Sequence, residues 1–238
     1  MASVGEERAG STVAWEPWMS KTLHHGLLVL ELLSENPKGL STTEIAEGVG
    51  LHRTVAHRLV RTLEAHHLCR RDEFKRILPA TGLVSLAEPV ERDLRALARP
   101  VLEHLADATR ATTHLVVRED ESEVRALLVV EPREAKVHVS FRPGQTHPVD
   151  AGSAGLALLA SAPPLDGERP EVAEARRQGY AVTDGEVIPA VIGVSAAVPT
   201  RRGRSTTSVG VSVFELPDAA QLGRTVTEAA AELADRLR

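Results

Sequence analysis

The stretch Ser41–His67, STTEIAEGVGLHRTVAHRLVRTLEAHH, decides how the chain is interpreted. Its first part predicts a short helix that Ser41 caps, because Glu44 three residues later completes a capping box. Ile45 and Val49 would then face inward, and the glycines at positions 48 and 50 would bracket a turn. Its second part predicts a helix over residues 52–66, so the stretch indicates two short helices joined by a glycine turn.

The second of these helices has two unlike faces. At about 100° per residue, one side carries Val55, Ala56, Leu59, Val60 and Leu63. The other side carries Arg53, Thr54, His57, Arg58 and Arg61. The apolar side predicts a contact with a protein core. The opposite side presents cations and short hydrogen-bonding groups, which suits a helix that lies in the major groove of DNA.

The flanking segments complete a known motif. Residues 20–34 predict a helix with leucines at positions 23, 27, 30 and 33 and Ser20 as its N-cap. Residues 68–82 predict a β-hairpin with a charged turn. Three helices followed by a hairpin constitute a winged helix-turn-helix. The net charge of the chain is −5, yet residues 50–78 hold seven Lys/Arg residues against three acids, so positive charge is concentrated where such a domain needs it.

This motif assigns DNA contacts to individual side chains. Base edges would be contacted from the first half of the second helix, by Arg53, Thr54, His57 and Arg58, since an arginine can bind guanine O6 and N7 together. Phosphates would be contacted by Thr42, Thr43, His52 and Arg61. Lys75 and Arg76 of the hairpin would reach the DNA backbone or the minor groove. A solvated basic helix face is the alternative interpretation, which the ordered succession of capping box, turn and hairpin disfavours.

The rest of the chain predicts a second domain. Residues 82–110 indicate a helical block that Pro100 should bend, with an apolar stripe of Val90, Leu94, Leu97, Val101 and Leu105. Strand patterns follow at 114–120, 124–132 and 136–144, then helices at 150–162 and 168–179, strands at 180–187, 191–200 and 206–216, and a closing helix at 216–238. This order predicts an antiparallel sheet with helices packed on it, and an α+β fold overall.

Four segments, in order, resemble the IclR family of bacterial transcription regulators. They are residues 40–72, 94–115, 141–160 (FRPGQTHPVDAGSAGLALLA) and 176–199 (RRQGYAVTDGEVIPAVIGVSAAVP). The resemblance implies an N-terminal winged helix, a linker helix, a GAF-like effector-binding domain and a homodimer or tetramer. The predicted domains are a mobile arm at 1–19, a DNA-binding domain at 20–82, the linker helix and first helix of the C-terminal domain at 83–110, and the effector-binding domain at 111–238.

The resemblance also implies an effector site. Its residues would be Gly152, Ser153, Ala154, Asp184, Gly193 and Ser212, with Gly193 where the family often has a cysteine. Backbone N–H groups of residues 152–154 at a helix N-terminus would favour a carboxylate or phosphate. Because only 3% of residues are aromatic, we expect a small organic acid rather than a stacked ring. The alternative is a DNA-binding protein whose C-terminal domain only oligomerises, which the unusually short segment 159–179 favours.

Other classes of protein are disfavoured. The chain lacks a run of about 18 apolar residues and a secretory signal at its start, and its one cysteine, Cys69, excludes an internal disulfide, so we expect a cytoplasmic protein. The adjacent histidines 24/25 and 66/67 lack the spacing of metal ligands, so neither metal nor cofactor is expected. His147, Asp150 and Ser153 resemble parts of a hydrolase triad but lie too close in sequence. We therefore expect a regulator that reads a palindromic operator and is not an enzyme.

Overall fold

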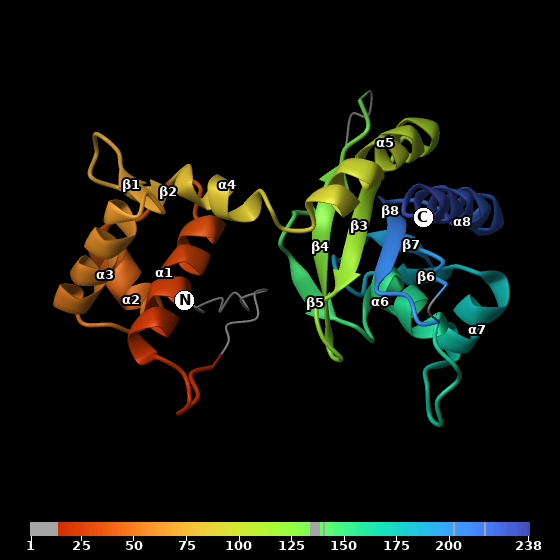
Figure 1. Ribbon diagram of the computed structural model, residues 1–238, viewed down its shortest axis with the longest axis horizontal. Helices are drawn as coiled ribbons and strands as arrows, with labels where there is room; N and C mark the ends of the chain where they lie inside the picture. Colours follow the sequence, from red (N-terminus) through yellow and green to blue (C-terminus); the bar gives the residue numbers. More distant parts are fainter. Residues whose placement is uncertain (1–13, 134–138, 140, 202, 217) are drawn as a thin grey trace, which may run out of the picture. The chain divides into compact units, whose positions relative to one another are not determined.

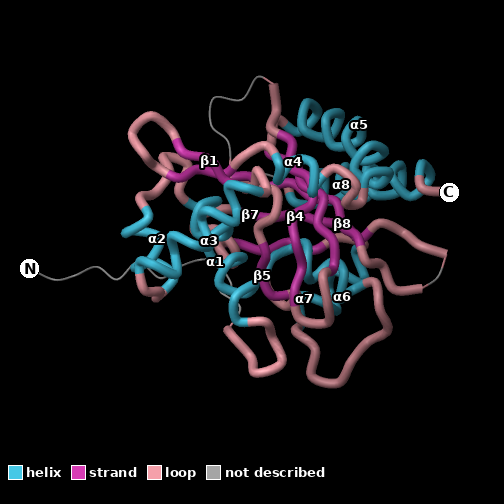
Figure 2. Tube along the Cα trace, turned by 60° about the vertical axis from the view of Figure 1, so that its left-hand side comes forward, coloured by secondary structure: helices cyan, strands magenta, loops and turns pink. Residues whose placement is uncertain are grey.

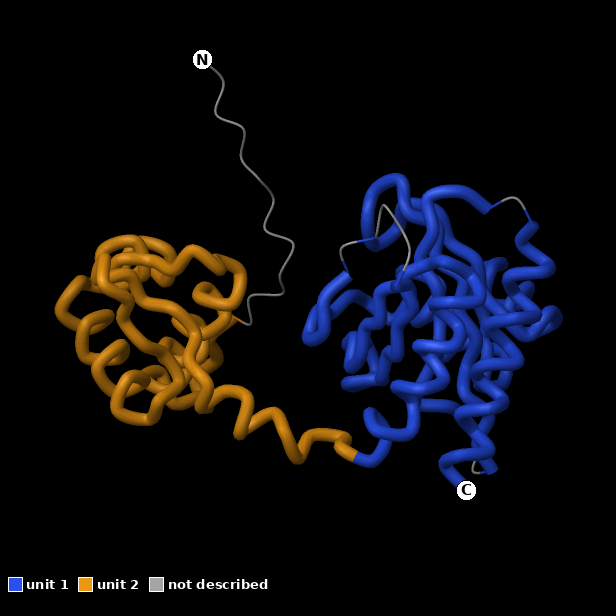
Figure 3. Tube along the Cα trace, turned by 90° about the horizontal axis from the view of Figure 1, so that it is seen from above, with its two compact units in different colours: residues 1–11, 93–238 blue, residues 12–92 orange. Residues whose placement is uncertain are grey.

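The computed structural model describes residues 14–133, 139, 141–201, 203–216 and 218–238. The chain divides into two compact units, with the boundary between Arg92 and Asp93 (Figure 3). Each unit is described by itself below. Residues 1–13 of the predicted arm at 1–19 lie outside the described residues.

The N-terminal unit has the predicted helices and hairpin (Figure 1). Its elements are α1 (Lys21–Glu35), α2 (Thr42–Val49), α3 (Arg53–Ala65), β1 (Cys69–Arg71), β2 (Ile77–Pro79) and α4 (Gly82–Ala87). Strands β1 and β2 pair antiparallel, with Cys69 opposite Pro79. The helices and the hairpin enclose one apolar cluster, whose fully buried members include Val29, Leu33, Ile45, Ala56, Val60 and Ile77.

Two details of the predicted helix faces are wrong. In α1, Leu23 and Leu27 are 63% and 48% exposed, whereas Val29 and Leu33 are fully buried. The inward side of α1 follows Gly26, Val29 and Leu33, at spacings of three and four residues, and of the predicted leucines Leu30 and Leu33 pack against the core. In α3, Val55 lies at the edge of the apolar face and is 42% exposed. Ser20 occupies the N-cap position of α1, but its side chain makes no capping hydrogen bond.

The capping box at the start of α2 is confirmed. Glu44 N donates to Ser41 Oγ at 3.2 Å, and Ser41 N donates to Glu44 Oε2 at 2.6 Å. The Ser41 N–H holds the pKa of the Glu44 carboxyl below its usual value. Gly50 ends the helix with a left-handed φ of 71°, which a residue without Cβ adopts freely. Gly48 lies inside α2 and does not take part in the turn.

The connection between the units is not one helix. Helix α4 ends at Ala87, and α5 (Arg92–Thr109) begins after a short turn in which Glu91 has a φ of 45°. Val90 lies in this turn and is 51% exposed, so the apolar stripe begins only at Leu94. Residues 83–110, where the linker helix and the first helix of the C-terminal domain were predicted, thus contain two helices with this turn between them. Pro100 lies inside α5, as expected.

In the C-terminal unit, the described residues form a six-stranded antiparallel sheet (Figure 2). Its strands are β3 (Thr112–Arg118), β4 (Glu123–Val130), β5 (Thr146–Pro148), β6 (Ala181–Asp184), β7 (Ile192–Ala197) and β8 (Thr207–Val213), in the spatial order β5-β4-β3-β8-β7-β6. The predicted order of elements and the α+β class are confirmed. Of the segment predicted as a strand at 136–144, residues 136–138 and 140 lie outside the described residues. Residues 141–144 lead into a turn, and β5 pairs with β4 instead.

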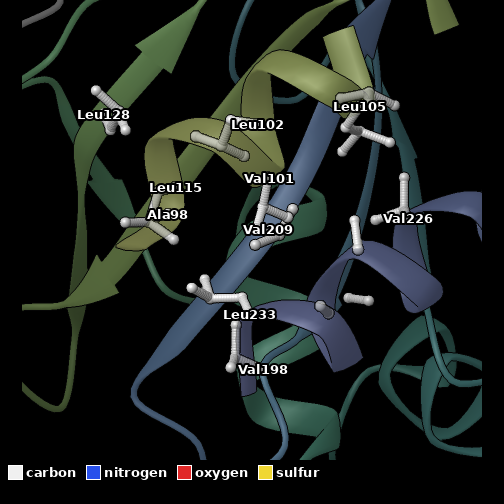
Figure 4. Packing of buried hydrophobic residues seen from close by; sticks show 14 of the residues in the cluster. Ala98, Val101, Leu102, Leu105, Leu115, Leu128, Val198, Val209, Val226 and Leu233 are labelled. Atoms are coloured by element: carbon white, nitrogen blue, oxygen red, sulfur yellow. The ribbon is translucent and has the colours of Figure 1, made fainter. Parts of the chain in front are cut away.

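Helices cover both faces of this sheet. Helices α5 and α8 (Ala219–Arg236) pack on one face, where Val101, Leu115, Val209 and Leu233 are buried together (Figure 4). Helix α6 (Gly152–Ala160) packs on the other face, and α7 (Pro170–Gln178) packs against α6. Because side chains alternate between the faces of a strand, the residues between those of the first core point toward α6.

Candidate functional site

The exposed side of α3 presents unpaired cations. Arg53, His57 and Arg58 are exposed, and within the described part of the chain their side chains have no hydrogen-bond or ion-pair partner. Thr54 is exposed beside them. His52 caps the helix, because its Nδ1 accepts the N–H of Thr54 at 3.3 Å. The first half of α3 therefore has several donors available for an external acceptor.

The residues expected at phosphates lie in different surroundings. Thr43 is exposed and Thr42 is half-buried at the start of α2. Arg61 forms an ion pair with Glu64 at 3.5 Å, but its side chain is 69% exposed and remains open to other partners. A pair this exposed contributes little stability, so exchanging Glu64 for a phosphate would cost little.

The hairpin tip is ordered by one carboxylate. Asp72 Oδ1 accepts the N–H of Phe74 at 3.0 Å and that of Arg76 at 2.8 Å. Lys75 adopts a left-handed φ of 61° in this turn and is exposed. Lys75 is therefore presented on a defined turn, whereas Arg76 points back into the domain.

Arg76 departs from its predicted role. Its guanidinium donates to Gly39 O at 2.6 and 2.9 Å and to Lys38 O at 3.1 Å, and it forms an ion pair with Glu44 at 3.4 Å. These contacts connect the hairpin to the loop before α2 and to its capping box. The expectation that Arg76 contacts DNA conflicts with this use of its donors, and we assign it to the stability of the domain.

A second candidate site lies between α6 and the sheet of the C-terminal unit. A cavity of about 40 Å³ is enclosed there. A single water molecule needs a cavity volume of roughly 10–15 Å³, so this cavity has room for a ligand of only a few non-hydrogen atoms. Its lining comes from the strands β3, β5, β6, β7 and β8, the start of α6, and the segments that precede β5 and join β6 to β7. The residues are His114, Phe141, His147, Gly152, Ser153, Ala154, Thr183, Val187, Ile188, Val191, Gly193 and Ser212.

Strand register builds the floor of this cavity. His114 lies opposite Gly210, which lies opposite Ser195 on the next strand. In the adjacent row, Ser212 lies opposite Gly193, which lies opposite Thr183. Each row is thus a set of small and polar residues on the α6 side of the sheet, and neighbouring positions along each strand belong to the apolar core beneath α5 and α8.

The two glycines in these rows are needed for space. A Cβ at Gly210 would collide with both Ser195 Oγ and His114 Nε2. A Cβ at Gly193 would collide with Ser153 Oγ. Because neither glycine has a side chain, Ser153, Ser195 and His114 can contact one another across the strands.

These three residues form a buried chain of hydrogen bonds. Ser153 Oγ and Ser195 Oγ are 2.8 Å apart, and Ser195 Oγ is 3.3 Å from His114 Nε2. Burial, and secondarily the neighbouring His147, lowers the pKa of His114 to about 3, so this imidazole is neutral at pH 7. Its Nδ1 has no hydrogen-bond partner among the described residues. A buried polar atom of this kind is costly unless a ligand or water satisfies it.

The N-terminus of α6 carries a carboxylate of the same chain. The Gly152 N–H donates to Glu186 Oε2 at 2.8 Å, and Arg169 Nη2 donates to Glu186 Oε1 at 2.8 Å. Hydrogen bonding to Arg169, and also to the Gly152 N–H, lowers the pKa of Glu186. The Gly152 N–H, one of the groups predicted from the sequence to bind an effector anion, therefore binds the carboxylate of Glu186.

Five of the six predicted effector residues line the cavity: Gly152, Ser153, Ala154, Gly193 and Ser212. Asp184 does not; it is exposed at the end of β6, and its neighbour Thr183 faces the cavity. Sequence reasoning did not assign His114, which sits in an apolar strand pattern, or Glu186, which acts through a contact 34 residues away. Alternation along β3 places His114 on the same side as Val116, and this was the available signal for it.

The short segment 159–179 does not contribute a residue to the lining of the cavity. The segment is itself held together by Arg176, which donates to Ala162 O at 3.1 Å and to both carboxylate oxygens of Glu168.

The described residues do not show the geometry of a hydrolase triad or of a metal site. His147 Nδ1 pairs with Pro148 O at 3.0 Å, and Ser153 pairs with Ser195, so His147, Asp150 and Ser153 do not form a triad. No cluster of metal-ligating side chains occurs within the described ranges. None of the helices described combines the length and apolar character needed to cross a bilayer. Cys69 is buried, which raises the pKa of its thiol to about 11.

Comparison with known proteins gives a consistent result. The model of the IclR helix-turn-helix domain matches residues 22–73, and that of the bacterial transcriptional regulator IclR C-terminal domain matches residues 89–169. The HTH-type transcriptional regulator BhcR of Paracoccus denitrificans is 26% identical over 95% of this chain and 90% of its own length. The transcriptional repressor IclR of Escherichia coli is 27% identical over 59% of this chain and 52% of its own length.

Solved structures share the fold. An IclR transcriptional regulator from Alicyclobacillus acidocaldarius has a TM-score of 0.76 at 24% identity, covering 92% of this chain and 99% of that one. An IclR homologue from Microbacterium hydrocarbonoxydans, complexed with 4-hydroxybenzoate, has a TM-score of 0.78 at 23% identity, with the same coverage.

Proposed function

This chain belongs to the IclR family of DNA-binding transcriptional regulators, and we propose that it is a dimer that binds a palindromic operator and responds to a small carboxylate. The observation that carries the DNA-binding part is the exposed side of α3, where Arg53, His57 and Arg58 have no partner among the described residues. The family consists of transcription regulators and not enzymes, and we propose that this protein acts on DNA in the cytoplasm.

We assign the contacts on DNA as follows. Arg53, Thr54, His57 and Arg58 would face base edges, since they occupy the exposed first half of α3. Thr42, Thr43, His52, Arg61 and Lys75 would face phosphates. Arg76 is left out, because Gly39 and Glu44 already use its guanidinium.

Exposed apolar side chains of the N-terminal unit support the dimer. Leu23 and Leu27 on α1 are 63% and 48% exposed, and Val84 and Leu86 on α4 are 69% and 63% exposed. Large aliphatic side chains in this number are suited to a contact with a second copy. A dimer with two-fold symmetry requires two half-sites, which is the reason for proposing a palindrome.

The cavity below α6 supports a small effector. Its lining contains the hydroxyls of Ser153, Thr183 and Ser212. Gly152 also lines it, and the Gly152 N–H and the Arg169 guanidinium donate to the same carboxylate, that of Glu186. These donors suit a carboxylate. The 4-hydroxybenzoate of the Microbacterium homologue is larger than the space available here, so we propose an acid with fewer non-hydrogen atoms, or a cavity that widens as it is filled.

Two experiments test the proposal. Selection of bound DNA from a random pool should return an inverted repeat, and the Arg58→Ala variant should lose preference at one position of each half-site. Arg236→Ala, an exposed arginine of the C-terminal unit, serves as the control. Binding without any sequence preference would contradict the proposal for α3.

A thermal-shift screen of short carboxylic acids tests the effector. A ligand of the folded state raises the melting temperature as its concentration exceeds the dissociation constant. Silence across the whole panel would favour the alternative, in which the C-terminal domain only oligomerises.

A further inference from the structure

Glu186 occupies the position that an effector carboxylate would need. One oxygen, Oε2, accepts the Gly152 N–H at 2.8 Å. The other, Oε1, accepts from Arg169 Nη2 at 2.8 Å, and Arg169 Nη1 donates to Asp150 O at 2.7 Å. The Gly152 N–H, on a residue that lines the cavity, and the Arg169 guanidinium are thus both satisfied by a carboxylate of the chain itself.

Glu186 is continuous with the wall of the cavity. The next two residues, Val187 and Ile188, line it. Val187 packs so tightly on the start of α6 that a Cβ at Gly152 would lie 2.5 Å from Val187 Cγ2. Release of Glu186 from Gly152 would therefore free the side chains that restrict the volume of the cavity.

The interior of the cavity points independently to a ligand. His114 is 4% exposed, and its Nδ1 lacks a hydrogen-bond partner among the described residues. Its Nε2 is already used by Ser195, so Nδ1 remains for a group that enters the cavity. The Gly152 N–H is thus occupied by Glu186, while a polar atom of another lining residue, His114 Nδ1, is unsatisfied.

We propose that Glu186 is an internal competitor of the effector: a small carboxylate binds by taking the Gly152 N–H and the Arg169 guanidinium in place of Glu186. This inference rests on the proposed effector function and adds how the site is regulated. While Glu186 is bound, the site is closed to anions. The apparent affinity for the effector is therefore the intrinsic affinity multiplied by the fraction of molecules in which Glu186 has left. Binding also releases the segment 185–191 that joins β6 to β7.

The test measures the affinity of the full-length protein for acetate and propionate by NMR, with the Gly152 amide as the reporter. Glu186→Ala removes the competitor and should tighten binding by about tenfold. Glu171→Ala is the matched control, because Glu171 also pairs with Arg169, at 3.3 Å, and has no hydrogen bond to Gly152. It should change the affinity less than about twofold. Acetamide, which lacks the charge, should not gain from Glu186→Ala.

Each outcome decides one point. Tighter binding by Glu186→Ala and not by Glu171→Ala supports the proposal. Equal or weaker binding by both overturns it and makes Glu186 a structural cap of α6, while the carboxylate site itself stands. Absence of binding in every variant, with melting temperatures that show folded protein, overturns the proposed carboxylate effector together with the competitor and leaves DNA binding unaffected.

Discussion

Arg76→Ala should destabilise the N-terminal unit without weakening its electrostatic attraction to DNA. The guanidinium donates to Gly39 O at 2.6 and 2.9 Å and pairs with Glu44 at 3.4 Å. Buried hydrogen bonds to a charged group contribute roughly 1.5–3 kcal/mol each. Because the Arg76 side chain is 38% exposed, we expect a total loss of only about 2 kcal/mol in the free energy of unfolding. In a domain of this size, that corresponds to roughly 8–16 °C in melting temperature.

Amide hydrogen exchange of the full chain locates the effect. Faster exchange is expected in the loop before α2 and in the hairpin, and unchanged exchange in the C-terminal unit. Binding to an operator, measured at several salt concentrations below the melting temperature, should keep its salt slope. Arg58→Ala is the counterpart: its side chain has no partner among the described residues, so stability should stay within about 0.5 kcal/mol while specific binding weakens by about 1–3 kcal/mol per contact.

The opposite result for Arg76 would refute this reasoning. A phosphate contact adds about 0.9 to the slope of log affinity against log salt, so a dimer that loses two would change by about 1.8. A change of that size in Arg76→Ala, with unaltered stability, would restore Arg76 to the DNA interface and show that its contacts with Gly39 and Glu44 are weak.

Three further outcomes are expected. The pKa of His114 lies near 3 in the folded protein against 6.5 when unfolded, so its contribution to stability is complete above pH 6.5 and is lost as pH falls toward 3, by about 1.4 kcal/mol per pH unit. Urea unfolding between pH 7 and 5.5 should therefore show that the free energy of unfolding depends less steeply on pH in His114→Gln than in the unmodified protein. The exposed control His104→Gln should leave this pH dependence unchanged. Gly210→Ala should destabilise by about 1–3 kcal/mol, because the new Cβ collides with Ser195 and His114; a neutral result in thermal melting would contradict the row of small residues. Gly26→Ala should instead stabilise α1 by up to about 1 kcal/mol, since the nearest atom to its Cβ is 4.0 Å away; a loss in the same assay would mean that α1 and α3 cannot separate even slightly.

The fold was largely predictable because its signals are local. A capping box, a glycine turn and a two-faced helix each depend on residues within one or two helical turns, and all three are present. Errors arose where tertiary packing selects among several apolar residues. In α1, leucines occur on more than one side, and contact with α2, α3 and β2 determines that Val29 and Leu33 are buried while Leu23 is exposed.

The candidate DNA-binding residues and the cavity differ in how far sequence could predict them. The α3 residues share one helix face, so their exposure follows from periodicity alone. The cavity instead depends on strand register. Ser153, Ser195 and His114 are up to 81 residues apart. They meet because Gly210 pairs with both His114 and Ser195, and because Gly210 and Gly193 have no side chains that would fill the space. For the same reason the sequence did not reveal the contacts of Glu186 and Arg76, since each finds partners distant in the sequence.

Strand alternation also suggests how an occupied cavity could affect the helix that leads to the DNA-binding unit. Ser195 forms hydrogen bonds with Ser153 and His114, which line the cavity, whereas Val194 and Ala196 on either side of it belong to the apolar core with Val101 of α5. A rigid pleated strand cannot shift Ser195 without shifting its neighbours, and a close-packed core transmits such shifts. Helix α5 begins at Arg92, where the two units meet. A ligand could alter the DNA-binding unit by this route only if it binds one arrangement of β7 more tightly than another. The hydrogen bond between Ser153 and Ser195 makes β7 sensitive to what occupies the cavity, and we therefore expect ligand sensitivity to depend on Ser195 more than on Gly152 and Arg169.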